Sequence, residues 1–254
     1  PLIPADRRGT SYAIPLSAAT VSRVTAAGQC SYEDYDATRH TNYRSVLGTL
    51  SHVANFTHPE MAFAISFASQ YMQNPSEAHF EMLLNILLYA YAARDKVVRF
   101  RRQSHPPDVS PIMVACDADL SNSANCRSRT GFCAYLFGML IAWHSRLQPP
   151  VSLSTAESEY MAISAAARFA VWSRMLVGDF GIERCYRDPV YFFSDNKSAI
   201  CIANNPITHK HSRHIDRRLH WLREQCLAGT INVVFISTED NVADIMTKAL
   251  KRDL

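Results

Sequence analysis

The sequence predicts a mixed α/β fold for its C-terminal part, preceded by a mainly helical part. A long helical pattern over 155–177 separates the third from the fourth of five short apolar runs that have the length of strands. Three prolines between Gln103 and Pro111 mark the boundary between the two parts. The five predicted strands are 112–116, 131–137, 140–143, 190–193 and 231–236.

Length and composition describe a globular chain with more than one domain. The chain has 254 residues, of which 48% are hydrophobic and 19% charged, so it can bury a sizeable core. This length suits one full domain with a smaller second one. The formal net charge of +3 is mild, and by itself it indicates neither a nucleic acid nor a membrane as partner.

The seven cysteines are widely scattered and form no Cys-x-x-Cys pair, so neither a disulfide framework nor a cysteine zinc site is predicted. A reduced, intracellular compartment is the expectation. No segment reaches the roughly 18 uninterrupted apolar residues of a membrane span, and we expect no membrane association. The chain opens with Pro1 and without a leader pattern, which suggests a fragment or a processed product.

The N-terminal part is predicted to contain a loose lead-in and a helical module. Residues 1–41 show no clear periodicity, and we expect them to be loosely structured. The helical module covers 42–102, with two helices over 43–72 that are broken near Thr57-His-Pro59. A further helix is predicted to begin at Ser76 and to end near Arg94.

The C-terminal domain is predicted over 111–250, with the element order βββαβααβα. Its second and third strands are separated by Gly138 and Met139 only, so they form a hairpin. After the long helix and the fourth strand come a short helix behind Asp195, a helix over 211–227, the last strand and a final helix from Asp240.

Two aspartates follow predicted strands directly, Asp117 after the first and Asp195 after the fourth. In open α/β sheets ligands gather at the carboxyl ends of strands, so the two are candidates for one site. Taken singly, each also fits an ordinary turn or helix-cap role.

The long helix carries two glutamates with different predicted roles. Ser154-Thr-Ala-Glu157 reads as a capping box, in which the Glu157 carboxylate returns to the amide of Ser154. Glu159 lies about 200° further around the helix and is the better ligand candidate. A buried stripe is predicted to hold the helix against the sheet. It comprises Met161, Ala165, Phe169, Trp172 and Leu176.

Asp244, early in the final helix, is the fourth candidate carboxylate. In isolation it fits a first-turn acid that interacts with the helix dipole. Asp117, Glu159, Asp195 and Asp244 at one point would repel one another unless cations lay between them. Such a cluster suits two Mg²⁺ ions, which could activate a water molecule for attack on a phosphodiester.

Seven ordered sequence blocks of the C-terminal domain carry a family resemblance. They are Cys116-Asp-Ala-Asp119, Arg129-Thr-Gly-Phe132, Ile141-Ala-Trp-His-Ser145, Ser152-Leu-Ser-Thr-Ala-Glu-Ser-Glu-Tyr160, Ser194-Asp-Asn-Lys-Ser-Ala-Ile200, His211-Ser-Arg-His-Ile-Asp216 and Asn241-Val-Ala-Asp-Ile-Met-Thr-Lys248. In order and spacing they resemble the ribonuclease H region of copia-type retrotransposon Pol polyproteins. Upstream, Tyr43-Arg-Ser-Val-Leu-Gly-Thr-Leu50 and Thr57-His-Pro-Glu-Met-Ala-Phe-Ala64 resemble the end of the same family's reverse transcriptase.

The resemblance implies a ribonuclease H-like fold after a reverse transcriptase remnant, and a two-metal endonuclease that cuts the RNA strand of RNA/DNA hybrids. The family's metal-binding carboxylates fall on Asp117, Glu159, Asp195 and Asp244. The implied cofactor is Mg²⁺, for which Mn²⁺ can substitute. The implied partners are the hybrid and the remainder of the polyprotein, in a cytoplasmic particle or the nucleus. The polymerase's paired aspartates are absent from this chain, so we expect no DNA synthesis.

Several polar residues are candidates for contact with the hybrid, through its phosphates and 2′-hydroxyls. Each could also be an ordinary solvated side chain. A zinc site formed by His209, His211 and His214 is an alternative that lacks a fourth ligand. The candidates are Arg127, Arg129, Asn196, Lys197 and Arg213.

Two other functions compete with the nuclease. The chain could be a catalytically inactive, decayed or host-recruited copy that serves as a nucleic-acid or protein-binding module. It could also be a strand-transfer domain of an integrase or transposase, which shares the architecture. The placement of Glu159 between the first two aspartates, with Asp244 in the last helix, argues against strand transfer.

Overall fold

The computed structural model divides the chain into two compact units. Unit 1 comprises residues 1–98 and 248–254, and unit 2 comprises residues 99–247. The division after Val98 falls shortly before the proline-rich stretch that predicted a boundary. The structure describes residues 13–29, 37–101, 109–120, 127–149, 151–182, 184–204 and 216–249.

Unit 1 is helical, and the predicted break at Pro59 separates α2 from a short 3₁₀ turn. Its core is formed by large apolar side chains such as Tyr43, Leu50 and Met82, each at most 2% exposed. The elements are α1 (Ala18–Ala27), α2 (Ala37–Phe56), η3 (Pro59–Met61), α3 (Ala62–Ala68), η4 (Ser69–Tyr71) and α4 (Glu77–Ala92).

Helix α1 corrects the expectation of a loosely structured lead-in over 1–41. The Ser17 hydroxyl accepts a hydrogen bond from the Thr20 amide at 3.2 Å and so caps the helix. Val24 of α1 is fully buried in the core of unit 1. The helix is therefore held by tertiary packing that the weak periodicity of this segment does not reveal.

Unit 2 has the five predicted strands, with α6 as an additional short helix. The final helix α9 begins at Asp244 and not at Asp240 as predicted, because Thr238–Asp240 form a 3₁₀ turn and Asn241 has an extended backbone. The elements are β1 (Ile112–Asp119), β2 (Arg129–Leu136), β3 (Met139–Leu147), α5 (Thr155–Asp179), α6 (Arg184–Arg187), β4 (Val190–Ser194), α7 (Lys197–Asn204), α8 (Asp216–Leu227), β5 (Ile231–Phe235), η5 (Thr238–Asp240) and α9.

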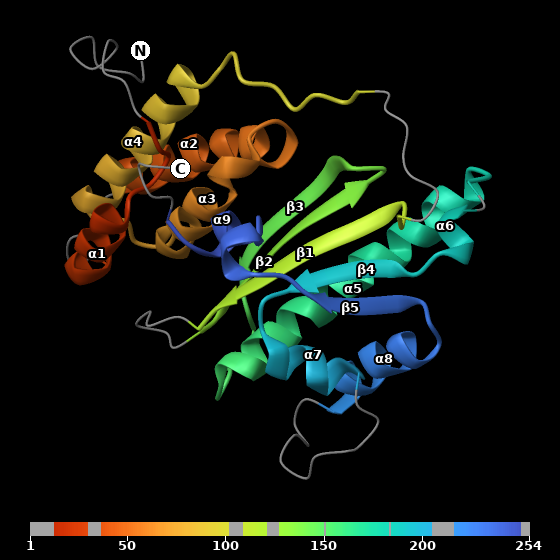
Figure 1. The fold of residues 1–254 in the computed structure, drawn as a ribbon. Helices are drawn as coiled ribbons and strands as arrows, with labels where there is room; N and C mark the ends of the chain where they lie inside the picture. Colours follow the sequence, from red (N-terminus) through yellow and green to blue (C-terminus); the bar gives the residue numbers. More distant parts are fainter. Residues whose placement is uncertain are drawn as a thin grey trace. The chain divides into compact units, whose positions relative to one another are not determined.

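The strands form one mixed sheet in the order β3-β2-β1-β4-β5 (Figure 1). Strand β2 is antiparallel to β1 and β3, whereas β1, β4 and β5 run parallel. This confirms the predicted five-stranded mixed sheet with flanking helices, the ribonuclease H-like arrangement. Because the three parallel strands point the same way, residues that follow their carboxyl ends gather at one edge of the sheet.

The hairpin between β2 and β3 turns at Phe137-Gly138, one residue earlier than predicted. Both residues have positive φ, 51° and 77°, as a type I′ turn requires. The Phe137 amide donates a 2.7 Å hydrogen bond to the carbonyl of Pro111, just before β1. The turn is thus tied to the neighbouring strand.

Helix α5 packs on the sheet largely through small side chains, and of the predicted stripe Met161 is buried and Phe169 packs against the core. Trp172 and Leu176 are 56% and 38% exposed, so that part of the prediction is wrong. Small residues at the contact allow a helix to approach a sheet closely. The buried face of α5 includes Ala162, Ile163, Ala166, Ala167 and Ala170.

No helix in the described part of the chain, α5 included, is long and apolar enough to cross a membrane.

Candidate metal centre

Asp117 and Asp195 lie at the same edge of the sheet, on neighbouring parallel strands. Asp195 directly follows β4, as predicted. Asp117 lies within β1, which continues to Asp119 and is therefore longer than predicted. The strand is extended because Asp117, Ala118 and Asp119 pair with Gly131, Thr130 and Arg129 of β2. The Asp117 backbone is consequently held by β2, whereas the pairing of β1 with β4 covers Met113, Val114 and Ala115.

Glu157 and Glu159 are separated as the helix geometry predicts. The Ser154 hydroxyl accepts from the Glu157 amide at 3.2 Å, which caps α5. The Glu157 carboxylate accepts from the amide of Leu153 at 2.8 Å, and not from that of Ser154 as predicted. Glu159 lies on the buried side of α5 and is 4% exposed. Only Glu159 can therefore contribute to a site at the sheet.

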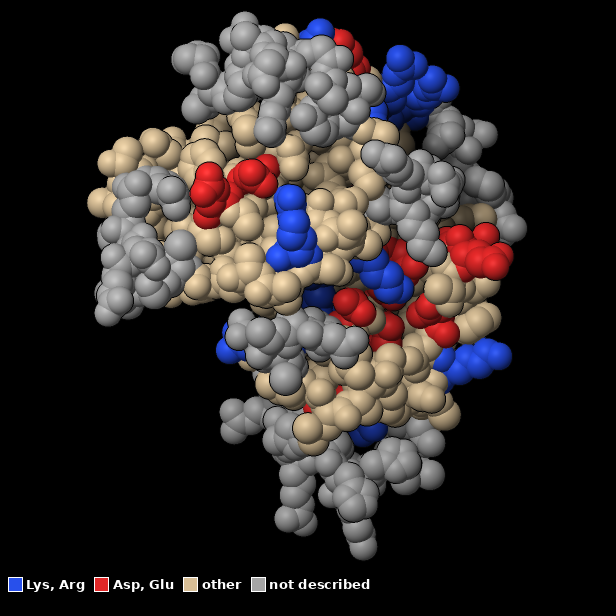
Figure 2. Space-filling view, turned by 90° about the vertical axis from the view of Figure 1, so that its left-hand side faces the viewer, with Lys and Arg blue, Asp and Glu red and all other residues tan. Residues whose placement is uncertain are grey.

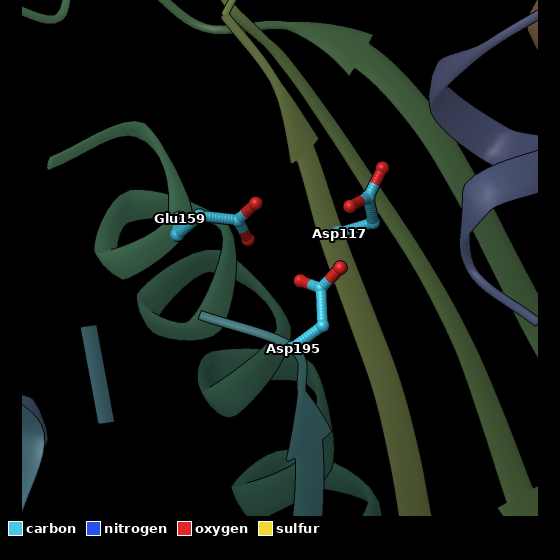
Figure 3. Close-up of side chains that lie close together, drawn as sticks. All are labelled: Asp117, Glu159 and Asp195. Carbon is cyan, nitrogen blue, oxygen red and sulfur yellow. The ribbon is translucent and has the colours of Figure 1, made fainter. Parts of the chain in front are cut away.

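Three carboxylates converge in unit 2. Asp117, Glu159 and Asp195 each offer an oxygen, and these oxygens lie within 4.8 Å of one another. Figure 3 shows the three side chains around one space, from β1, α5 and the end of β4. Asp117 is 1% exposed and Asp195 is half-buried, so the group is closed on the side of the core.

Asp244 does not belong to this group of three among the described residues. It is the first residue of α9 and is half-buried. Its amide donates to the carbonyl of Asn241 at 3.1 Å. The same short helix contacts the site through Thr247, so Asp244 lies on an element that adjoins the other carboxylates.

Acidic side chains gather at this end of the sheet. The arrow of β4 points to the left in Figure 1, and the face seen from that side carries a group of acidic side chains with Lys and Arg side chains beside it (Figure 2). Behind the carboxylates, burial raises the pKa of the Cys116 thiol well above its usual value, and the charges of Glu159, Cys133 and Asp117 raise it further. Cys116 is therefore a neutral core residue.

Two threonines from the segment after β5 donate hydrogen bonds to the aspartates. The Thr247 hydroxyl donates to Asp117 Oδ2, and the Thr238 hydroxyl donates to Asp195 Oδ2 at 2.7 Å. Sequence reasoning assigned neither threonine a role. Thr247 belongs to the block Asn241–Lys248 that carried the family resemblance, and this membership was the signal in the sequence that could have indicated a role.

Gln148 connects the end of β3 with the first turns of α5, and sequence reasoning missed it too. Its side-chain nitrogen donates to Thr130 Oγ1 at 3.0 Å and to the carbonyl of Ser158 at 2.8 Å. Its oxygen accepts from the Ser152 hydroxyl at 2.8 Å. Because Ser158 precedes Glu159, this buried network fixes the part of α5 that presents the glutamate.

The candidate substrate contacts have different positions. Arg127 and Lys197 are exposed, and the Lys197 ammonium lies 4.9 Å from the centre of the Phe235 ring. Asn196 accepts from the Ala199 amide at 2.9 Å and so caps α7. Arg129 corrects the prediction, because it is 4% exposed and its guanidinium lies 3.4 Å from the Ser145 hydroxyl. Arg213 and the three histidines of the zinc alternative lie outside the described residues.

Comparisons with known proteins find curated relatives by sequence and solved structures by fold. The chain is 31% identical over 213 residues to the retrovirus-related Pol polyprotein from transposon TNT 1-94 of Nicotiana tabacum. It is also 31% identical over 222 residues to the Pol polyprotein from transposon RE1 of Arabidopsis thaliana. These matches cover 83% and 87% of this chain and 15% of each polyprotein. No model of a known protein family matches.

The chain belongs to the family of copia-type retrotransposon Pol polyproteins. A solved structure of a foamy viral protease-reverse transcriptase in complex with an RNA/DNA hybrid shares the fold of this copia-type chain. The match has a TM-score of 0.52 and 13% identity, and covers 93% of this chain and 28% of that chain. The copia-type chain spans about 15% of the length of these curated relatives.

Proposed function

We propose that unit 2 is a metal-dependent ribonuclease H, which hydrolyses the RNA strand of RNA/DNA hybrids during reverse transcription of a retrotransposon. The convergence of Asp117, Glu159 and Asp195 within 4.8 Å carries this proposal. Membership in the Pol family supports it, because copying an RNA element into DNA generates such hybrids.

The donor set fits a hard divalent cation. It consists of carboxylate oxygens, which are the ligands that Mg²⁺ prefers. Three carboxylates this close repel one another, and two of them have lost nearly all contact with solvent. Asp117, Glu159 and Asp195 would hold the metal, and we include Asp244 as a further ligand on the family resemblance. Two bound Mg²⁺ ions would supply an activated water and neutralise charge on the phosphodiester.

The protein's own contribution is to hold these charges in place. Asp117 is fixed by its pairing with Gly131 of β2, and Glu159 by the Gln148 network at the start of α5. The half-buried Asp195 lies at the open side, where the backbone of a substrate can approach. The exposed cations Arg127 and Lys197, together with Arg213, would contact phosphates of the hybrid.

The test compares the full chain with two Asp→Asn variants on a hybrid labelled on its RNA strand. Asp195→Asn should remove most cleavage in Mg²⁺ or Mn²⁺, because a negative ligand is lost. Binding of the hybrid, measured by fluorescence anisotropy in Ca²⁺, should remain. Asp179→Asn makes the same chemical change at the exposed opposite end of α5 and should cleave like the parent.

The outcome also separates the nuclease from a binding module. The nuclease proposal requires that the parent cuts only the RNA strand and that Mg²⁺ or Mn²⁺, but not Ca²⁺, supports cleavage. If the parent binds the hybrid and leaves it intact throughout Mg²⁺ and Mn²⁺ titrations, the nuclease proposal is wrong and the chain is a binding module.

A further inference from the structure

The segment Ser237–Thr247, here called the C-terminal clamp, reaches both aspartates of the candidate site. Thr238 lies near its start and donates to Asp195, and Thr247 lies at its end and donates to Asp117. The two threonines thus connect one continuous segment to ligands on two different strands.

The clamp is anchored beside Asp117 by a buried side-chain amide. Asn241 donates from Nδ2 to the carbonyl oxygen of Cys116 at 2.9 Å, and Cys116 directly precedes Asp117. The Asn241 Oδ1 atom accepts from the Ala243 amide at 3.2 Å and so shapes the turn into α9. Asn241, which is 3% exposed, therefore sets both the position of the clamp beside Asp117 and the turn into α9.

The clamp approaches β2 closely because residue 131 is a glycine. A Cβ atom at Gly131 would lie 2.7 Å from both Met246 Cβ and Thr247 Cγ2. Gly131 pairs with Asp117 across β1 and β2, so the position faces the same side of the sheet as that aspartate. The missing side chain lets α9 bring the Thr247 hydroxyl to Asp117.

A hydroxyl that donates to a carboxylate fixes the rotation of the carboxyl group, and so fixes how its oxygens face a metal. This effect is largest for Asp117, which is buried together with Thr247, since each is 1% exposed. Thr238 is exposed and acts on the half-buried Asp195, so its effect is smaller.

We propose that Thr247 and Thr238 are positioning residues, whose hydroxyls orient Asp117 and Asp195 for binding of a divalent cation. This inference rests on the proposed function, since it concerns the same metal centre. Partners of metal-binding carboxylates typically change metal affinity about 10-fold to 100-fold when they are removed. The orientation of Asp117 and Asp195 therefore depends on the C-terminal clamp.

The experiment measures Mn²⁺ affinity of the full chain by electron paramagnetic resonance, without substrate. Thr247→Val keeps the shape of the side chain and removes the hydroxyl, and should raise the Kd about 10-fold or more. Thr247→Ser restores the hydroxyl and should stay within about threefold of the parent. Thr49→Val, an exposed change on α2 in unit 1, should leave the Kd unchanged. A Thr247→Val variant with the Kd of the parent overturns the proposal.

Three further outcomes are decisive. If Thr247→Val lacks the parent's circular dichroism spectrum, the Thr238→Val variant decides. Its Kd for Mn²⁺ should rise roughly twofold to tenfold. An unchanged Kd of Thr238→Val would overturn the proposal. A parent that binds Mn²⁺ but leaves hybrid uncut refutes the nuclease alone, and the threonine variants still test positioning. A parent that binds no Mn²⁺ overturns both.

Discussion

Replacing Gly131 by alanine tests how closely α9 must approach β2. The new Cβ would lie 2.7 Å from Met246 Cβ and Thr247 Cγ2 and 3.2 Å from the carbonyl oxygen of Ala243. Carbon atoms in contact normally lie about 3.5–4.0 Å apart. Because a Cβ atom moves only with its backbone, α9 must shift by roughly 1 Å. Overpacking of this kind costs about 1–3 kcal/mol of unfolding free energy.

The same shift should separate the Thr247 hydroxyl from Asp117. We therefore expect Gly131→Ala to lower the stability of unit 2 and to weaken Mn²⁺ binding about 10-fold. All three tryptophans lie in unit 2, so tryptophan fluorescence during urea unfolding reports on that unit alone. Mn²⁺ affinity is measured on the same samples.

The control is Gly48→Ala in α2, where no atom lies within 4 Å of the added Cβ. Alanine is favoured over glycine in a helix by about 1 kcal/mol, so this variant should be as stable as the parent or more so by circular dichroism. If Gly131→Ala matches the parent in both unfolding midpoint and Mn²⁺ affinity, the close packing of α9 does not hold the site.

Three further predictions follow from the described contacts. Glu157→Ala removes the cap on the Leu153 amide and should cost about 0.5–2 kcal/mol in urea unfolding, while cleavage of hybrid persists; loss of all cleavage at unchanged stability would reverse the roles of the two glutamates. Burial lowers the pKa of His79 from 6.5 to about 4, so the folded state favours the neutral ring. The contribution of this neutral ring to the free energy of unfolding is complete above pH 6.5 and falls by roughly 3 kcal/mol as the pH falls toward 4. Unfolding followed by circular dichroism should show this pH dependence for the parent and a weaker one for His79→Gln. Iodoacetamide should modify the exposed Cys201 in the native protein but spare the buried Cys116, as peptide mass spectrometry can check, and rapid modification of both would contradict the burial of β1.

The strands and three of the four carboxylates could be predicted because their signals are local. Short apolar runs bounded by turn residues indicate strands, and an aspartate directly after such a run lies at or near the strand's carboxyl end. Helix geometry alone separated Glu159 from Glu157. These inferences need no knowledge of which other segments lie nearby.

The errors concern contacts between distant segments. Arg129 is buried because β2 extends to pair with Asp119, which a run beginning at Gly131 does not indicate. Thr247 contacts a residue 130 positions earlier in the chain, and no local pattern encodes such a hydrogen bond. Helix α1 likewise depends on its packing within unit 1.

The order of these segments along the chain has a consequence for synthesis. Domains fold as units as they leave the ribosome, and residues form distant contacts only when both partners have been made. Asp117, Glu159 and Asp195 all precede the C-terminal clamp, whose hydroxyls hold two of them. A nascent chain that has not reached Thr247 therefore has its acidic residues but not their final arrangement. Translation therefore completes the hydrogen bonds around these carboxylates only after the clamp, the last part of the domain, has been made.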